Sequence, residues 1–184
     1  MFGEGPRNAR LMLVGEQPGD REDREGHPFV GPAGRILDGA LERAGIPRDD
    51  VYVTNAVKHF RWEARGKRRI HRKPSLGQIA ACRPWLDAEI STVKPEILVC
   101  LGATAAQALL GSSFRVTKHR GELLHGEGLE PTVMATIHPS AILRAPEEDR
   151  EDEEAAFVRD LAAAARAMAS AATDGTRSAR SAGR

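Results

Sequence analysis

Residues 66–73, GKRRIHRK, surround one histidine, His71, with five lysines and arginines. Lysine and arginine bind phosphate groups better than histidine does, so a segment that only holds phosphates has no need of the imidazole. Most segments rich in lysine and arginine are nevertheless solvated surfaces or general nucleic-acid patches. By itself the segment leaves both a chemical role and a plain surface role open for His71.

Residues 15–20, GEQPGD, form a glycine-rich turn directly after an apolar run. The turn does not read as a phosphate cradle, because it matches neither G-x-G-x-x-G nor the P-loop pattern. Pro18 also removes one N–H donor, and Glu16 would repel a bound phosphate. A turn that presents Glu16, Gln17 and Asp20 to a ligand fits better, although a plain loop with exposed acidic side chains fits equally well.

Two further side chains could recognise a planar group. Phe29 lies in a loop rich in proline and glycine, GHPFVGPAGR (26–35). A phenyl ring held in such a loop can stack on a base, although a hydrophobic plug over the end of a sheet is the simpler interpretation. Asn55 ends an apolar run, and its amide both donates and accepts hydrogen bonds, so it can match a nucleobase edge that does the same. It could equally well cap a turn.

The segment HPSAILR (138–144) follows another apolar run. Pro139 suits the first turn of a helix, where Ser140 and free N–H groups form an anion site. Arg144 lies one helical turn after Ser140 and can reach the same phosphate. His138, at the strand end, can donate a hydrogen bond to a leaving-group oxygen. A helix cap with a surface arginine is the alternative.

The elements that position these residues follow from the apolar pattern. Short apolar runs predict strands, and longer stretches with helical spacing predict helices between them. This alternation predicts an α/β fold, a three-layer α/β/α sandwich with a central, mostly parallel four-stranded sheet. Ligands of such sheets bind at the carboxyl ends of the strands, where three of the polar motifs would converge. The expected strands are 10–15, 51–57, 96–102 and 132–138, and the expected helices are 33–45, 75–93, 103–111 and 153–169.

Composition bounds the remaining possibilities. The 184 residues are 41% hydrophobic, which fits one domain over residues 1–170, and the small polar residues 171–184 predict a disordered tail. The net charge of +1 gives no general attraction to polyanions, so a nucleic acid must meet a local patch. No run approaches the roughly 20 apolar residues of a membrane span. We therefore expect a soluble, cytoplasmic monomer.

The motifs, in their order along the chain, resemble the uracil-DNA glycosylase superfamily. The segments GEQPGD, GHPFVGPAGR, TNAVKH, GKRRIH and HPSAILR carry this resemblance, which runs from Ala9 to Arg144. They are most similar to the iron–sulfur, family-four-like branch, and the KRRIH insertion is similar to that of its UdgX type. The resemblance implies excision of uracil from DNA, with single strands preferred. It also implies covalent, single-turnover capture of the abasic sugar by the loop histidine, which maps onto His71.

The resemblance gives the other residues expected roles. His138 and Asn55 would stabilise the charge that develops on the departing base, Gln17 would help to bind uracil, and Phe29 would stack on the flipped-out base. Glu16 would accept the imidazole proton or orient the nucleophile. Arg69 could instead anchor the loop. The expected DNA contacts are Asp20, Lys67, Arg68, Arg69, Ser140 and Arg144.

The same branch binds a 4Fe-4S cluster through four protein ligands that begin with a Cys-x-x-Cys pair. This sequence starts at MFGEGP, without that pair, and the two later positions map onto His59 and Cys82. Two ligands do not hold a cluster. We therefore expect an incomplete or absent cluster, either because the start of the chain has been trimmed, which we favour, or because the cluster has been lost.

Three other functions remain open. An ordinary turnover glycosylase would use water activated near Glu16 or Gln17. A non-catalytic module that binds DNA lesions would use the same basic loop and Phe29. A phosphate-ester hydrolase would need metal ligands, and the sequence offers no convincing carboxylate and histidine set for one.

Overall fold

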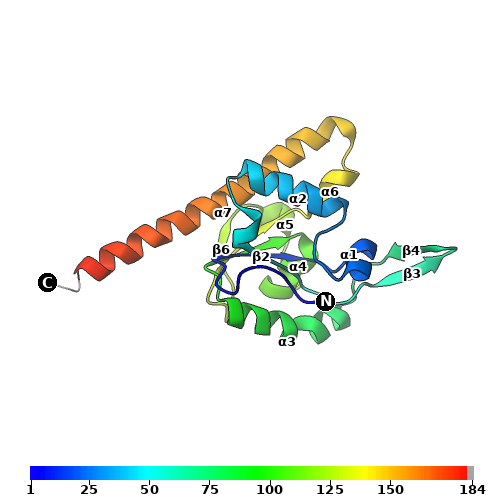
Figure 1. Ribbon diagram of the computed structural model, residues 1–184, viewed down its shortest axis with the longest axis horizontal. Coiled ribbons are helices and arrows are strands. Elements are labelled where there is room, and N and C mark those ends of the chain that lie inside the picture. The colour runs from blue at the N-terminus through cyan, green and yellow to red at the C-terminus, as the bar shows by residue number, and fades with distance from the viewer. Residues whose placement is uncertain (182–184) are drawn as a thin grey trace.

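A five-stranded sheet forms the centre of the protein, in the strand order β2-β1-β5-β7-β6 (Figure 1). The computed structural model describes the backbone of residues 1–181 and the side chains of residues 1–170. Four strands are parallel and confirm the prediction, while β6 pairs antiparallel with β7 at one edge. The sequence pattern missed β6 because it is short and largely exposed. The strands are β1 (Leu11–Gly15), β2 (Val51–Asn55), β5 (Ile97–Leu101), β6 (Leu123–His125) and β7 (Thr132–Thr136).

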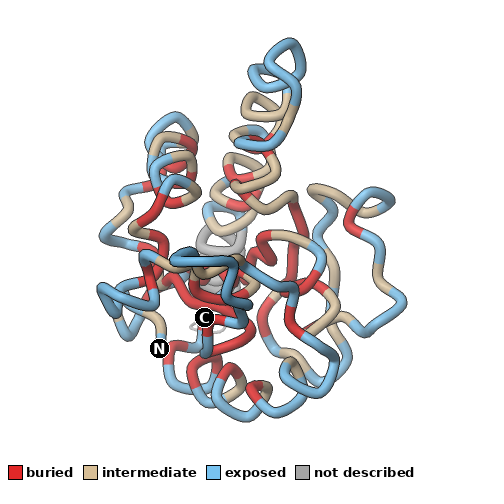
Figure 2. Tube along the Cα trace, turned by 90° about the vertical axis from the view of Figure 1, so that its right-hand side faces the viewer, coloured by how far each residue is buried: buried red, intermediate tan, exposed pale blue. Residues whose placement is uncertain are grey.

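Helices cover both faces of this sheet, which confirms the α/β/α sandwich (Figure 1). Leu11 and Leu13 of β1 pack in one buried cluster with α2 (Pro32–Arg43) and α7 (Glu147–Ser181). Met12 and Val14 point to the other face and pack with α3 (Leu76–Val93) and α4 (Ala103–Leu110). Successive strand residues alternate between faces, so a strand buried on both sides is apolar throughout. Figure 2 shows the buried residues gathered in the centre and the exposed ones along the outer turns.

The helices follow the predicted pattern closely. Ser75 caps α3 through a capping box with Gln78, because each side chain bonds the other residue's backbone N–H. The last helix begins at Glu147, earlier than predicted, with three acidic residues in its first turn that suit a helix N-terminus. None of the helices in the described chain has the length and apolar character to cross a membrane. The remaining helices are α1 (Asp20–Glu25), η1 (Arg48–Asp50), α3 (Leu76–Val93), α4 (Ala103–Leu110), α5 (Val116–His119) and α6 (Pro139–Arg144).

The helix α7 runs to Ser181, into residues 171–184, where we expected a disordered tail. The backbone of residues 171–181 is helical, whereas the side chains from 171 on and residues 182–184 lie outside the described part. The domain boundary at residue 170 stays a prediction.

The basic segment is a β-hairpin and not the loop that we expected. Strands β3 (Trp62–Arg65) and β4 (Arg68–His71) pair antiparallel and project from the body beside α1 (Figure 1). Gly66 turns the chain with φ +60°, a conformation that favours glycine. The strands escaped prediction because charged residues occupy both faces and hide the period of two. His71 thus lies at the foot of the hairpin, next to the sheet.

Candidate functional site

The polar motifs meet in one cleft at the carboxyl ends of the parallel strands. The cleft has a volume of about 840 Å³. Its position agrees with the rule that ligands of such sheets bind where the strands end. The cleft brings together Glu16, Gln17, Asp20, Phe29, Asn55, His71, His138, Ser140 and Arg144 among its lining residues. The other predicted site residues, Lys67, Arg68, Arg69, His59 and Cys82, do not line it.

Glu16 connects the sheet to the hairpin histidine. Its Oε1 lies 3.2 Å from His71 Nε2, while the hydroxyl of Thr104 donates a hydrogen bond to its Oε2. Burial opposes the charge of the carboxylate, but the hydrogen bonds from His71 and Thr104 outweigh it, so the pKa of Glu16 lies below its usual value. Glu16 is therefore a carboxylate held in one orientation with one oxygen aimed at His71.

Gln17 fastens the foot of the hairpin. Its Nε2 donates to the carbonyls of Arg61 and Arg72 at 3.3 and 3.1 Å, and its Oε1 accepts from the Arg61 N–H at 3.2 Å. The side-chain amide is buried and used by these contacts. These contacts position the hairpin, and the expected uracil contact of Gln17, which lines the cleft, stays a prediction.

Arg69 anchors the hairpin to α1, the alternative that the sequence left open. Its guanidinium forms ion pairs with Asp20 and with Asp23, the latter at 2.7 Å. It also lies over the rings of Phe60 and Trp62, at 5.3 and 5.5 Å from their centroids. Asp20, expected to contact DNA, is thereby bound to Arg69.

His138 is held in one tautomer. The backbone N–H of Ser140 donates to its Nδ1 at 3.1 Å, and the Ser140 hydroxyl lies 2.8 Å from the same atom. Because Nδ1 accepts, a neutral ring carries its proton on Nε2. Burial is the main reason that the pKa of His138 falls to about 4, so the ring is neutral at pH 7.

These contacts correct the expected anion site at the start of α6. The Ser140 N–H is engaged by His138 and is not free for a phosphate. Arg144 lines the cleft, is exposed and pairs with no acidic side chain of the described chain. It remains the cation of this segment that can meet a phosphate.

Phe29 occupies a backbone position that a non-glycine residue rarely adopts, with φ +57°. Two glycines make room for it: a Cβ on Gly34 would overlap its carbonyl, and a Cβ on Gly15 would crowd its ring. The ring is buried and stacks against His138, with centroids 5.9 Å apart and planes at 27°. The ring packs in the buried core cluster, as the plug requires, and its strained residue also lines the cleft, so the stacking role stays a prediction.

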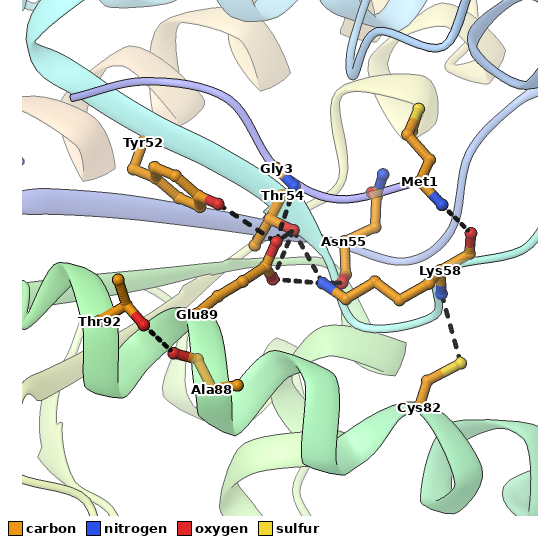
Figure 3. A network of polar contacts seen from close by, with 10 residues as sticks. All are labelled: Met1, Gly3, Tyr52, Thr54, Asn55, Lys58, Cys82, Ala88, Glu89 and Thr92. Atoms are coloured by element: carbon orange, nitrogen blue, oxygen red, sulfur yellow. Dashed lines mark hydrogen bonds and ion pairs between the residues drawn. The ribbon is translucent and has the colours of Figure 1, made fainter. Parts of the chain in front are cut away.

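Asn55 rests on a buried polar network (Figure 3). Lys58, 4% exposed, donates to the Asn55 carbonyl at 2.7 Å and forms an ion pair with Glu89 of α3. Glu89 also accepts from the Thr54 hydroxyl, at 2.9 and 3.1 Å, and from the Gly3 N–H at 2.7 Å. The side-chain amide of Asn55 lines the cleft. Unlike the Asn55 carbonyl, it forms no hydrogen bond with a side chain or backbone group of the described residues. The end of β2 is fixed from below while its amide faces the cleft.

Several residues of the site were not predicted. Thr104 resembles an ordinary helix start, and Lys58 and Glu89 lie 31 residues apart, so no local pattern joins them. Glu22 is a buried carboxylate that accepts from the Gly31 N–H at 2.8 Å and so fixes the loop that carries Phe29. A buried glutamate within the acidic stretch DREDRE gives no signal in the sequence that separates it from its exposed neighbours.

The described residues do not fit an iron–sulfur cluster. The Cys82 thiol is buried and accepts a hydrogen bond from the Lys58 N–H at 3.4 Å, whereas His59 is exposed. No three histidine, cysteine or acidic side chains of the described part come together as metal ligands. A 4Fe-4S cluster needs four, so His59 and Cys82 remain at most half of such a site.

Comparisons with known proteins find similarity to uracil-DNA glycosylases. The sequence profile of the uracil DNA glycosylase superfamily matches residues 2–162. The type-4 uracil-DNA glycosylase of Thermotoga maritima is 40% identical over 145 residues, which cover 78% of this chain and 71% of that protein. The type-4 enzyme of Pyrobaculum aerophilum is 37% identical over 150 residues, 78% of this chain and 73% of its own. The type-5 uracil-DNA glycosylase of the same organism is 32% identical over 156 residues, which cover 75% of this chain and 64% of that protein.

Proposed function

The chain belongs to the uracil-DNA glycosylase superfamily, and we propose that it excises uracil from DNA and is then joined covalently to the abasic site through His71. The observation that carries this proposal is the contact of 3.2 Å between His71 Nε2 and Glu16, inside the cleft that also holds Asn55 and His138. A nucleophile beside a carboxylate, facing base-recognition groups, is the arrangement that capture requires.

Uracil fits the cleft by its shape and by its hydrogen-bonding edge. The ring of Phe29 supplies a stacking surface for a base flipped out of the strand. The Asn55 amide offers a donor and an acceptor, which match uracil O4 and N3–H. The neutral His138 ring carries its proton on Nε2, so it can donate to a carbonyl oxygen on which negative charge develops. These groups stabilise the uracil anion as it leaves.

Capture then follows from the placement of His71. Glu16 accepts the proton of Nε2 while Nδ1 takes one from solvent, which frees the lone pair of Nε2. The C1′–N1 bond breaks and its electrons leave with uracil, while the lone pair of Nε2 forms the bond to C1′. The Nδ1 proton of the resulting ring passes to solvent.

The second candidate is turnover of the ordinary kind. The orientation of the Glu16 carboxylate, fixed by Thr104, also suits a base that activates water. In that case water attacks C1′, and the protein releases both products. Gln17 is not a candidate for this task because its amide is engaged by the hairpin backbone.

The two mechanisms differ in what remains on the protein. Incubation with a single-stranded oligonucleotide containing one uracil should release uracil and give an adduct that survives denaturing electrophoresis. The variant His71→Ala should give no adduct, and it should still release uracil if water can enter the vacated space. Uracil release by the wild type without any adduct would favour turnover, and no release at all would favour a binding module.

A further inference from the structure

Trp62 lies on the same face of the hairpin as His71. The two residues are directly paired across β3 and β4, and side chains of such a pair stand side by side on one face. His71 faces the cleft, so the indole of Trp62 extends the surface next to it. Trp62 is 44% exposed and belongs to neither buried core cluster. Core packing does not explain a tryptophan at this position.

The indole is nevertheless held in place. The guanidinium of Arg69 lies over its ring at 5.5 Å, and Arg69 is itself fixed by Asp20 and Asp23. A ring supported on one face and exposed elsewhere is a preorganised stacking surface, because little side-chain freedom remains to be lost on binding.

The tip of the same hairpin carries charge that folding does not explain. Arg65 and Arg68 are directly opposite each other, a like-charge pair that destabilises a hairpin. With Lys67 they form an exposed cluster, and none of the three pairs with an acidic side chain in the described part of the chain. A polyanion would relieve this repulsion.

We propose that the hairpin is a binding site for the strand next to the target nucleotide, with Trp62 stacked on an unpaired neighbouring base. The phosphates of that strand meet Arg65, Lys67 and Arg68. The occupant is single-stranded DNA, because only an unpaired strand offers an open base face to the indole while its backbone follows a row of cations. This site rests on the proposed function for the identity of the polymer.

Tryptophan fluorescence isolates the contact, because the chain has two tryptophans. In the variant Trp85→Phe, Trp62 is the sole tryptophan, and titration with oligothymidylate should quench its emission. The variant Trp62→Phe leaves Trp85, which lies on α3, 54% exposed, and its emission should not change. Binding of the oligonucleotide by another readout, without quenching in Trp85→Phe, overturns the proposal but leaves uracil excision intact.

A base-deletion series tests stacking against a structural role. Oligonucleotides carry uracil and an abasic tetrahydrofuran residue at one flanking position at a time. Wild type should lose about tenfold in affinity at one position, in line with the usual strength of base–aromatic stacking. Trp62→Ala should bind the intact strand about tenfold more weakly than wild type does. Its affinity should fall no further when the same flanking base is removed. Trp85→Ala, the matched control, should behave as wild type.

If removal of the flanking base lowers the affinity of wild type and of Trp62→Ala equally, the indole only supports Arg69. That result would refute the site. Quenching without uracil release would instead refute the proposed enzyme and keep the DNA site. The two proposals therefore fail on different measurements.

Discussion

The strand-end rim lines most of the cleft and the hairpin adds His71 to it, and the two regions are held in different ways. Of the rim residues, Asn55 ends β2 and His138 follows β7, and they are fixed by backbone hydrogen bonds and by the Lys58–Glu89 pair. The hairpin is fixed from outside, by the ion pairs of Arg69 and by the amide of Gln17. In the proposed mechanism, recognition of the base therefore rests on the core, and capture rests on a surface element.

The turn GEQPGD joins the rim to the hairpin. Glu16 contacts His71 and Gln17 bonds the backbone at the hairpin's foot, while β1, which precedes both, lies inside the sheet between β2 and β5. The difference between the rim and the hairpin predicts that changes beneath the rim lower stability, whereas changes in the hairpin lower capture.

The largest effect should come from breaking the buried pair. Lys58→Met leaves Glu89 charged and buried without its partner, which should cost about 3–5 kcal/mol in the free energy of unfolding. Chemical denaturation measures it. The exposed pair of Arg43 and Glu154 is the control, and Arg43→Gln should cost less than about 1 kcal/mol. Equal losses of unfolding free energy in Lys58→Met and Arg43→Gln would mean that the buried pair does not stabilise the rim more than a surface pair does.

Acid should loosen the rim through His138. Its folded pKa of about 4 lies below the ordinary 6.5, so between these values the folded state binds fewer protons than the unfolded state. The stability is fully present above pH 6.5 and falls as the pH falls, by roughly 3 kcal/mol at pH 4. The free energy of unfolding of the wild type, measured between pH 4 and pH 6.5, should fall as the pH falls. In His138→Gln this dependence on pH should disappear. The exposed His125→Gln should keep the wild-type slope.

Changing the anchor of the hairpin should separate capture from stability. Arg69→Gln removes contacts to Asp20 and Asp23 at the surface, so the free energy of unfolding should change by less than about 1 kcal/mol. The rate of adduct formation should fall by about 10- to 100-fold, because His71 is no longer held at its position. Arg83→Gln, which removes a surface pair on α3, should leave the rate unchanged. An unchanged rate in Arg69→Gln would show that the hairpin needs no anchor.

The smallest effect should come from Thr104→Val. Loss of one hydrogen bond to Glu16 should slow adduct formation by about tenfold. The hydroxyl contributes to the low pKa of Glu16, so its loss should raise that pKa and move the acid limb of the pH–rate profile to higher pH. Thr104→Ser, which keeps the hydroxyl, should restore both. A slower rate without any shift of the profile would indicate a packing defect.

The rim was largely predictable and the hairpin was not. Asn55 and His138 could be placed because parallel strands bring their carboxyl ends to one edge, whatever the details of packing. The tasks of Gln17 and Ser140 could not be predicted, because each depends on which group lies at hydrogen-bond distance. For Gln17 those groups are carbonyls 44 and 55 residues away.

The amino-acid pattern alone determined the sandwich and the edge at which its polar residues gather, because burial imposes a periodicity that can be read locally. It also singled out His71 and Glu16. The resemblance paired these two residues, but only the tertiary structure gave their contact at 3.2 Å, the orientation of the carboxylate by Thr104 and the position of Trp62 beside the histidine. Such contacts join segments that are far apart in the sequence, and their hydrogen-bonding register produces no periodic pattern of residues.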